Sequence, residues 1–311
     1  MSELRSPLAS SVCTIIVTYN AMEWIDRCLG SLERSELKTD LIVIDNKSND
    51  ITVAHVQDNY PQVKLFINDN NLGFGGANNQ GLVYAYSQGY DFFFLLNQDA
   101  WVDENTVGNL KKIMDDDKGY GITSPIHLSS NRSKFDDLFY EFVSDDVEDV
   151  FLNQVEGQLE VKEVHFVNAA AWMISKECLE KVGIFHPLFF HYGEDLNYVQ
   201  RVRYEGLRVG LVNQTYVVHD RDDRPPSKIK FDPFKRLERD LFLKLLEPNN
   251  SYGWIRYARY LSKRLKFISK DLSSREEVEA LRKFALDNFR VTYLKARKFD
   301  LRKLSINSSG E

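Results

Sequence analysis

The sequence has few cysteines and no long hydrophobic run. Only three cysteines occur among 311 residues, and they are far apart, which excludes a disulfide framework and a cysteine-based zinc site. The first ten residues contain no apolar core of signal-peptide length. No run of about 18 apolar residues occurs anywhere, so no membrane-spanning helix is expected. These absences indicate a protein of the reducing cytoplasm.

The sequence does contain enough apolar residues for a core, and its charge is uneven. Hydrophobic residues make up 43% and charged residues 28%, so the chain is not disordered. Residues 1–230 carry 21 basic and 35 acidic residues, whereas 231–303 carry 19 and 10. This asymmetry predicts two parts with different partners. The acidic body and the lack of any recognition motif argue against a nucleic acid as partner.

The first half of the chain alternates strand patterns with helix patterns. Apolar, β-branched segments predict buried strands at 11–19, 39–46, 63–69 and 91–99. Helical periodicity follows at 21–35 and 49–61, and a glycine-rich loop runs into a helix at 71–90. This order predicts an α/β fold with a Rossmann-like, mostly parallel central sheet flanked by helices.

The pattern changes after Pro125. Residues 131–163 are acidic and irregular, which predicts a loop-rich insertion. Ordered structure resumes at 164–176, followed by helices at 176–183 and 193–207 and a final strand ending at His219. From about residue 225 the chain is mostly helical. We therefore predict a body over 1–230 and a helical C-terminal region over 231–311.

Polar side chains gather where three of the predicted strands end. They are Thr18, Tyr19 and Asn20; Asp45 and Asn46; and Asn97, Gln98 and Asp99. Parallel α/β sheets bind ligands at the carboxyl ends of their strands, so a binding cleft is expected there. In it Tyr19 could stack on a base and Asp45 could accept the N–H of a pyrimidine. Asp45 could equally serve only to turn the chain with Asn46.

Other candidate residues lie in short polar motifs. The glycine-rich stretch is not a dinucleotide fingerprint, but Gly75 and Gly76 permit close approach of a ligand and Asn78 could donate to phosphate. Asp99 could hold a divalent cation that neutralises a leaving diphosphate. In Gly193-Glu194-Asp195 a carboxylate could act as a general base or simply favour a helix start.

The order of the motifs resembles the family 2 glycosyltransferases, which have the GT-A fold. These motifs are VTYN at 17–20, VIDN at 43–46, NLGFGGANNQG at 71–81, LLNQD at 95–99, NAAAWMISK at 168–176, GED at 193–195 and VVHD at 217–220. The resemblance covers about residues 11–221. It implies a catalytic domain over 1–230, with a nucleotide-sugar-binding part at 11–125 and an acceptor-binding part at 126–230.

The resemblance also implies roles for single residues in an inverting, metal-dependent transfer. Asp195 would be the catalytic base, and Asp99 and His219 would hold Mg or Mn. The nucleotide sugar would be bound by Thr18, Tyr19, Asn20, Asp45, Asn46, Gly76, Asn78, Asn97, Gln98 and Asp99. The acceptor would lie near Trp172, His191, Tyr192 and Glu194. The acceptor itself would be a glycan or a lipid-linked saccharide of cell-surface polysaccharide synthesis.

One departure from the family concerns the metal motif. The family's DxD-like motif reads Asn97-Gln98-Asp99, so its first carboxylate is missing. The bacterial rhamnosyltransferase-like subgroup with LNPD at this place is most similar, which makes dTDP-rhamnose the leading donor and leaves UDP-hexoses and UDP-galactofuranose open. A sugar nucleotidyltransferase lacks support, because no basic glycine-rich loop follows the first strand. A catalytically inactive sugar-nucleotide-binding protein is a further alternative.

The C-terminal region contains an amphipathic segment at 254–270. Its apolar side is formed by Trp254, Tyr257, Ala258, Leu261, Leu265 and Ile268, and its basic stripe by Arg256, Arg259, Lys263, Lys266 and Lys270. The segment could pack on the catalytic domain, form a homodimer interface or dock peripherally on the cytoplasmic face of an anionic membrane.

Overall fold

The computed structural model describes residues 12–154, 156–221, 232–249, 253–272, 274–298 and 304–306. The predictions for the first ten residues and for the boundary near residue 230 lie outside this part of the chain.

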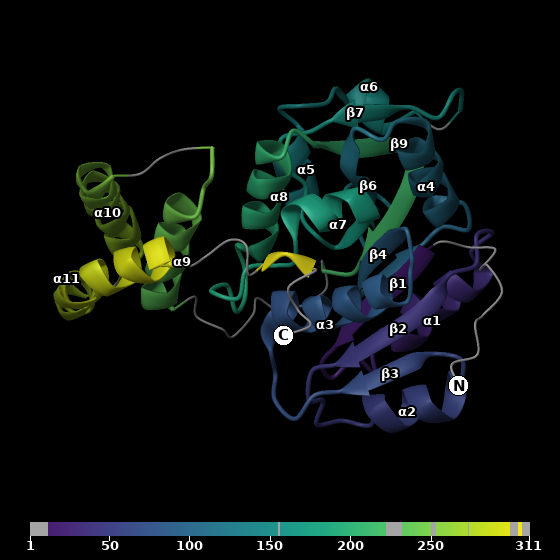
Figure 1. The fold of residues 1–311 in the computed structure, drawn as a ribbon, viewed down its shortest axis with the longest axis horizontal. Helices are drawn as coiled ribbons and strands as arrows, with labels where there is room; N and C mark the ends of the chain where they lie inside the picture. Colours follow the sequence, from purple (N-terminus) through teal and green to yellow (C-terminus); the bar gives the residue numbers. More distant parts are fainter. Residues whose placement is uncertain are drawn as a thin grey trace.

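Strands and helices alternate through the first two thirds of the chain (Figure 1). The strands are β1 (Val12–Thr18), β2 (Asp40–Asp45), β3 (Lys64–Ile67), β4 (Phe92–Asn97), β5 (Ala100–Val102), β6 (Tyr120–Leu128), β7 (Val161–Glu163), β8 (Ala171–Ser175) and β9 (Arg208–His219). The helices of this part are α1 (Ile25–Arg34), α2 (Thr52–Asn59), α3 (Gly73–Ser87), α4 (Thr106–Asp116), α5 (Asp137–Val143), α6 (Asp149–Leu152), α7 (Lys176–Val182) and α8 (Glu194–Tyr204).

One sheet runs through this part in the order β3-β2-β1-β4-β8-β6-β9-β5, with β7 paired to β9. The first four strands are parallel, as predicted. Beyond β4 the sheet is mixed, because β8 runs antiparallel to both β4 and β6. The carboxyl ends of β1, β2 and β4 therefore share one edge, and this edge positions the candidate site.

Both faces of the central strands β1, β2, β4 and β8 are buried, which explains why these strands are mostly apolar. In β1, Cys13 and Ile15 face a core built with α3, α5, α7 and α8, whereas Val12 and Ile16 face a core built with α1, α2 and α4. Helix α3 lies close on the sheet at Gly81, where a Cβ would stand 2.5 Å from Ile15 Cγ2.

The predicted insertion at 131–163 is more ordered than its irregular sequence indicates. It contains the short helices α5 and α6 and the strand β7. Strand β6 also continues past Pro125 to Leu128, because a register shift between Pro125 and Ile126 accommodates the missing N–H.

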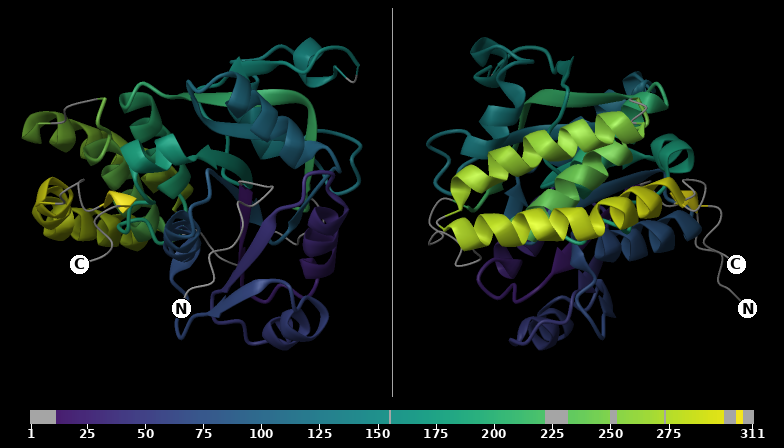
Figure 2. Two further views of the ribbon diagram at one scale, coloured as in Figure 1. Left: turned by 45° about the vertical axis from the view of Figure 1, so that its right-hand side comes forward. Right: turned by 90° about the vertical axis from the view of Figure 1, so that its left-hand side faces the viewer.

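Three further helices form a separate layer beside α8 (Figures 1 and 2). They are α9 (Pro233–Leu245), α10 (Trp254–Ile268) and α11 (Arg275–Lys298). Their shared core includes Leu241, Tyr257, Leu261 and Leu281, so the apolar side of the amphipathic segment is packed within the protein. Among the described residues no helix combines the length and apolar character needed to cross a membrane.

The chain then returns to the first part. The carbonyl of Leu304 accepts a hydrogen bond from Ile184 N at 2.8 Å, and Ile306 is buried in the core beneath α7 and α8. Residues 304–306 therefore belong to the packing of the α/β part of the protein and not only to the helical region.

Candidate active site

The ends of β1 and β2 are fastened together by a buried carboxylate. Asp45 is 1% exposed, and its oxygens accept from Thr18 Oγ1 at 3.0 Å and from the backbone N–H and hydroxyl of Ser48. Asp45 and Thr18 thus meet as predicted, and in this structure their hydrogen bond joins the ends of β1 and β2 beneath Tyr19. Contact of Asp45 with a base belongs to the proposed function.

Tyr19 follows Thr18 at the end of β1 and extends into solvent. Its side chain is 44% exposed, as a stacking platform requires. Gln98 holds its backbone from the neighbouring strand end, because Gln98 Oε1 accepts from Tyr19 N at 2.7 Å and Gln98 Nε2 donates to Tyr19 O at 3.2 Å. Asn20 has a positive φ of 51° and joins Ser48 and Asn49 through two hydrogen bonds.

Asn46 connects the end of β2 to the glycine-rich loop. Its side chain donates to Asn71 Oδ1 and Gly73 O and accepts from Leu72 N. Because Asn46 is only 3% exposed, its role in this structure is to fix the start of α3 and not to present a free amide.

The structure corrects the sequence prediction for Asn78. Its side chain is 2% exposed, and its amide donates to Phe74 O one turn earlier in α3. Asn78 is therefore not placed to contact a diphosphate. Gly76 lies on the partly exposed side of the same helix, beside Leu72. The neighbouring Asn79 pairs with both backbone groups of Phe185 at 2.8 and 2.9 Å.

Asp99 and His219 lie together at the end of β4 and β9, as predicted. His219 Nε2 is 3.5 Å from Asp99 Oδ1, because β5 pairs Ala100 directly with His219. Asn97 Nδ2 and Arg221 Nε point at the same ring nitrogen, at 3.4 and 3.2 Å. Two donors facing Nε2 indicate that this nitrogen carries the lone pair and that the proton is on Nδ1.

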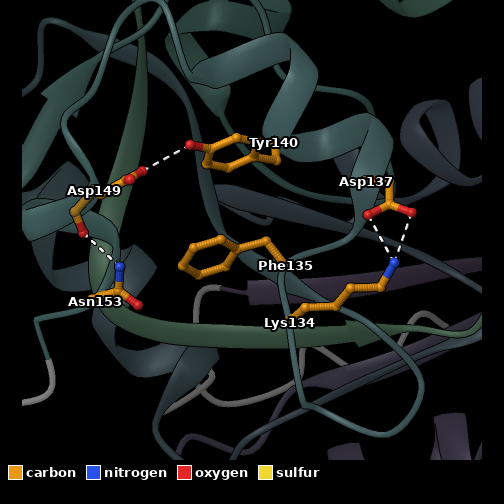
Figure 3. Close-up of a pocket in the computed structure, with 6 residues that line it drawn as sticks. All are labelled: Lys134, Phe135, Asp137, Tyr140, Asp149 and Asn153. Carbon is orange, nitrogen blue, oxygen red and sulfur yellow. Dashed lines mark hydrogen bonds and ion pairs between the residues drawn. The ribbon is translucent and has the colours of Figure 1, made fainter.

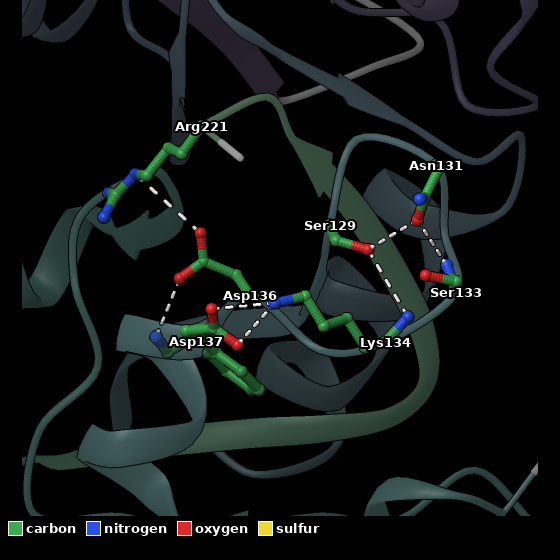
Figure 4. Close-up of polar contacts among 8 residues, drawn as sticks. Ser129, Asn131, Ser133, Lys134, Asp136, Asp137 and Arg221 are labelled. Carbon is green, nitrogen blue, oxygen red and sulfur yellow. Dashed lines mark hydrogen bonds and ion pairs between the residues drawn. The ribbon is translucent and has the colours of Figure 1, made fainter. Parts of the chain in front are cut away.

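Two charged residues that the sequence did not single out complete this cluster; Figure 4 shows these two, Asp136 and Arg221. The carboxylate of Asp136 is 3.8 Å from His219 Nδ1 and 3.8 Å from Arg221 Nε. Asp136 also caps α5 by accepting from Phe139 N at 2.8 Å. His127 lies behind them, and burial, with a smaller contribution from the charge of Arg221, holds its pKa well below the usual range.

These residues fit a divalent cation that is shared with a ligand. The imidazole of His219 and the carboxylate of Asp99, 3.5 Å apart, are donor types that suit one divalent cation. Asp136 lies 3.8 Å from His219 Nδ1, beyond hydrogen-bond distance. Within the described chain no group of three His, Cys, Asp or Glu side chains could hold a metal. Asp99 and His219 would therefore provide two ligands, and diphosphate oxygens would provide others.

Glu194 and Asp195 begin α8, and Asp195 lies within electrostatic reach of Arg221. Burial raises the pKa of Asp195, while hydrogen bonds from the backbone of Leu196 and Ala169 and the charge of Arg221 oppose the rise. Burial and the adjacent Asp195 raise the pKa of Glu194 to about 8, against the opposing charge of Arg239. Glu194 is 5% exposed, and its Oε2 has no hydrogen-bond partner.

The predicted acceptor residues divide into two groups. His191 and Tyr192 are exposed in the loop before α8, where a ligand can reach them. Trp172 is wholly buried and lies against Phe185 and Tyr198. It sits in β8, whose two faces are both covered, so direct contact with an acceptor is corrected to a packing role.

Comparison with known proteins identifies the family. The pattern described as "Glycosyl transferase family 2" matches residues 13–183, more than half of the chain. The chain therefore belongs to glycosyl transferase family 2, and it is a glycosyltransferase with the GT-A fold.

Individual relatives are distant but extend over most of the chain. The low-salt glycan biosynthesis hexosyltransferase Agl10 of Haloferax volcanii is 20% identical over 81% of this chain and 80% of its own length. The dTDP-rhamnosyl transferase RfbF of Shigella flexneri is 23% identical over 69% and 71%. The structure of S. aureus TarS 1–349 in complex with UDP-GlcNAc has a TM-score of 0.60 at 14% identity, covering 92% of this chain and 91% of that one.

Proposed function

We propose that the chain is an inverting, metal-dependent glycosyltransferase that moves a sugar from a nucleotide diphosphate to a glycan or lipid-linked saccharide. The observation that carries this proposal is the meeting of Asp99, His219, Arg221 and Asp195 at one edge of the sheet. Their charges suit a donor diphosphate on one side and an acceptor hydroxyl on the other.

Asp195 is the group that would remove the proton from the acceptor hydroxyl. As the acceptor oxygen bonds to the anomeric carbon, the bond from that carbon to the diphosphate breaks and the proton passes to the Asp195 carboxylate. Burial raises the pKa of Asp195, which makes the ionised carboxylate a stronger base than an exposed one.

Arg221 would oppose the negative charge that builds up on the departing diphosphate. A divalent cation, when bound by Asp99 and His219, would supply further positive charge at the same place. A mixed carboxylate and imidazole ligand set suits Mn better than Mg.

The donor that we favour is dTDP-rhamnose, in keeping with the Asn97-Gln98-Asp99 sequence and with the relative RfbF. A pyrimidine base would stack on the exposed Tyr19 above Asp45. The alternatives are UDP-hexose and UDP-galactofuranose, since TarS is bound to UDP-GlcNAc. Cytoplasmic polysaccharide synthesis at an anionic membrane, contacted through 254–270, would place the enzyme beside a lipid-linked acceptor.

The first test is thermal unfolding with UDP, dTDP and their sugars, with and without Mn²⁺. We expect a rise of about 5 °C at saturating ligand, because a ligand that binds only the folded state stabilises it. Asp99→Ala should lose the Mn²⁺-dependent rise. Asp195→Asn should keep the rise but transfer no sugar to an acceptor, so that no nucleotide diphosphate is released.

Either of two results would count against the proposal. If no nucleotide shifts the unfolding temperature of the wild type, the proposed donor site is wrong. A normal shift without product in the wild type, over a broad acceptor panel, would favour an inactive sugar-nucleotide-binding protein.

A further inference from the structure

A second concave site lies outside the catalytic cluster, in the insertion between β6 and β7 (Figure 3). It is an open pocket of about 290 Å³. It is lined by Lys134, Phe135, Asp137, Tyr140, Asp149 and Asn153. These residues come from the segment before α5, from α5 itself and from α6 and its end, so the helices that the sequence did not predict are the ones that shape it.

Two aromatic rings form the apolar part of this pocket. Phe135 and Tyr140 are almost parallel, with an angle of 5° between planes and 5.9 Å between ring centres. Tyr140 is 37% exposed and Phe135 is partly exposed. The electron-rich face of such a ring attracts the slightly positive C–H groups on the flat side of a sugar ring.

The pocket also carries hydrogen-bonding groups suited to hydroxyls. Asp149 accepts from the Tyr140 hydroxyl at 2.9 Å, and its backbone carbonyl accepts from Asn153 at 2.8 Å. Across the pocket, Lys134 is paired with both oxygens of Asp137 at 2.7 and 2.8 Å. Two carboxylates against one ammonium group disfavour an anionic ligand and suit a neutral polyhydroxyl one.

The pocket is connected to the catalytic cluster through a single residue. Asp136, between Phe135 and Asp137, is the buried carboxylate that faces His219 and Arg221. The turn before it is held by Ser129, Asn131 and Ser133 (Figure 4). The pocket therefore borders the active site along the chain without sharing side chains with it.

We propose that this pocket binds a neutral sugar residue of the acceptor, remote from the hydroxyl that receives the transferred sugar. The inference rests on the proposed function, because only an acceptor with more than one sugar would reach both places. It assigns the insertion to recognition of the acceptor chain and leaves the donor site to the sheet edge.

Saturation-transfer difference NMR on the full-length protein tests the inference. The probes are methyl glycosides and disaccharides of neutral hexoses and 6-deoxyhexoses at up to about 20 mM, since weak sugar sites have millimolar affinity. We expect signals from ring protons of at least one probe. They should fall about fivefold or more in Phe135→Ala and in Tyr140→Ala, because each substitution removes one aromatic face.

Leu138→Ala is the matched control, since Leu138 is exposed on α5 but does not line the pocket. Asp149→Asn is a milder variant that keeps the packing if an aromatic substitution unfolds the chain, and it should also weaken the signal. Equal signals in the wild type and both aromatic variants, or no signal from any probe, would overturn the inference.

The same preparations separate this failure from failure of the proposed function. If nucleotides raise the unfolding temperature but sugar binding does not depend on Phe135, only the acceptor pocket is wrong. If nucleotides produce no shift, the proposed function fails whatever the sugar probes show.

Discussion

Glu194 and Asp195 are adjacent carboxylates at the start of α8, yet their surroundings differ. Asp195 has backbone donors from Leu196 and Ala169 and the charge of Arg221 nearby. Glu194 is more fully buried and has an oxygen without a hydrogen-bond partner. Two carboxylates this close resist joint ionisation, so keeping the proton on Glu194 helps Asp195 to stay available as a base.

Replacing Glu194 with Gln should change how stability depends on pH. The folded wild type keeps a proton on Glu194 up to a pKa of about 8, whereas the unfolded chain loses it near 4.5. The wild type therefore loses stability as pH rises between these values, and Gln does not. Relative to the wild type, Glu194→Gln should gain up to roughly 1.4 kcal/mol per pH unit between pH 5 and 8.

Urea unfolding at four pH values would measure this gain. The exposed Glu177, paired with Lys181 on α7, provides the control, and Glu177→Gln should show no such trend. A constant difference between Glu194→Gln and the wild type across the range would show that Glu194 ionises normally.

Single residues also show what the sequence could and could not predict. Asp99 and His219 could be predicted because each lies at or just after the end of a strand, within a short motif that resembles the family. Trp172 was misplaced because a strand buried on both faces gives no alternation to tell core from cleft. Arg221 and Asp136 were missed because nothing local to them signals a partner, and folding alone brings them to His219.

At the level of elements, the loop before α8 covers the start of α3. Asn79 of α3 holds Phe185 by two hydrogen bonds. Gly73, with a φ of +74°, lies so near this loop that a Cβ would stand 1.9 Å from Phe190 O. The strand and helix order was predictable from periodicity, but this contact between distant segments was not, because the glycine-rich pattern fits several kinds of loop.

Gly73→Ala should therefore destabilise the protein strongly. The substitution combines a left-handed backbone, costing about 1–2 kcal/mol, with displacement of the covering loop. We expect a loss of at least about 3 kcal/mol in the free energy of unfolding. Gly89→Ala is the matched control, because Gly89 also has a positive φ of +87° but no atom within 4 Å of its added Cβ. Similar losses in both variants would argue that the loop does not rest on Gly73.

At the level of the whole molecule, the helical region packs against the loop before α8. Phe189, in the loop before α8, packs with Phe242 and Leu246 of the C-terminal region. Arg239 of α9 lies against Gly193, where a Cβ would be 3.1 Å from its Cγ. The sequence predicted a helical region with an amphipathic helix but could not reveal which surface its apolar side covers.

The exposed basic stripe of α10 and of the turn that follows it at Ser269–Asp271 should bind anionic vesicles. Its apolar side is packed in the bundle, so we expect electrostatic binding that weakens with salt and not deep insertion. Changing Arg256, Arg259, Lys263, Lys266 and Lys270 to Gln should reduce cosedimentation with phosphatidylserine-containing vesicles at least about tenfold. As control, five exposed lysines of the catalytic domain are changed instead: Lys38, Lys64, Lys112, Lys118 and Lys181. Equal losses in both sets would indicate a general charge effect, and unchanged binding of the stripe variant would refute membrane docking.

The pairing of Gln98 with Tyr19 indicates a structural role for the middle residue of Asn97-Gln98-Asp99. Backbone pairing between β1 and β4 ends at Val17 and Asn97, and beyond it the carboxamide of Gln98 imitates a peptide group, offering one donor and one acceptor. The ladder thus gains a rung made by a side chain. The proline of the LNPD subgroup could not supply both hydrogen bonds in this position, so Gln98, which stands in its place, holds Tyr19 in register with the end of β4.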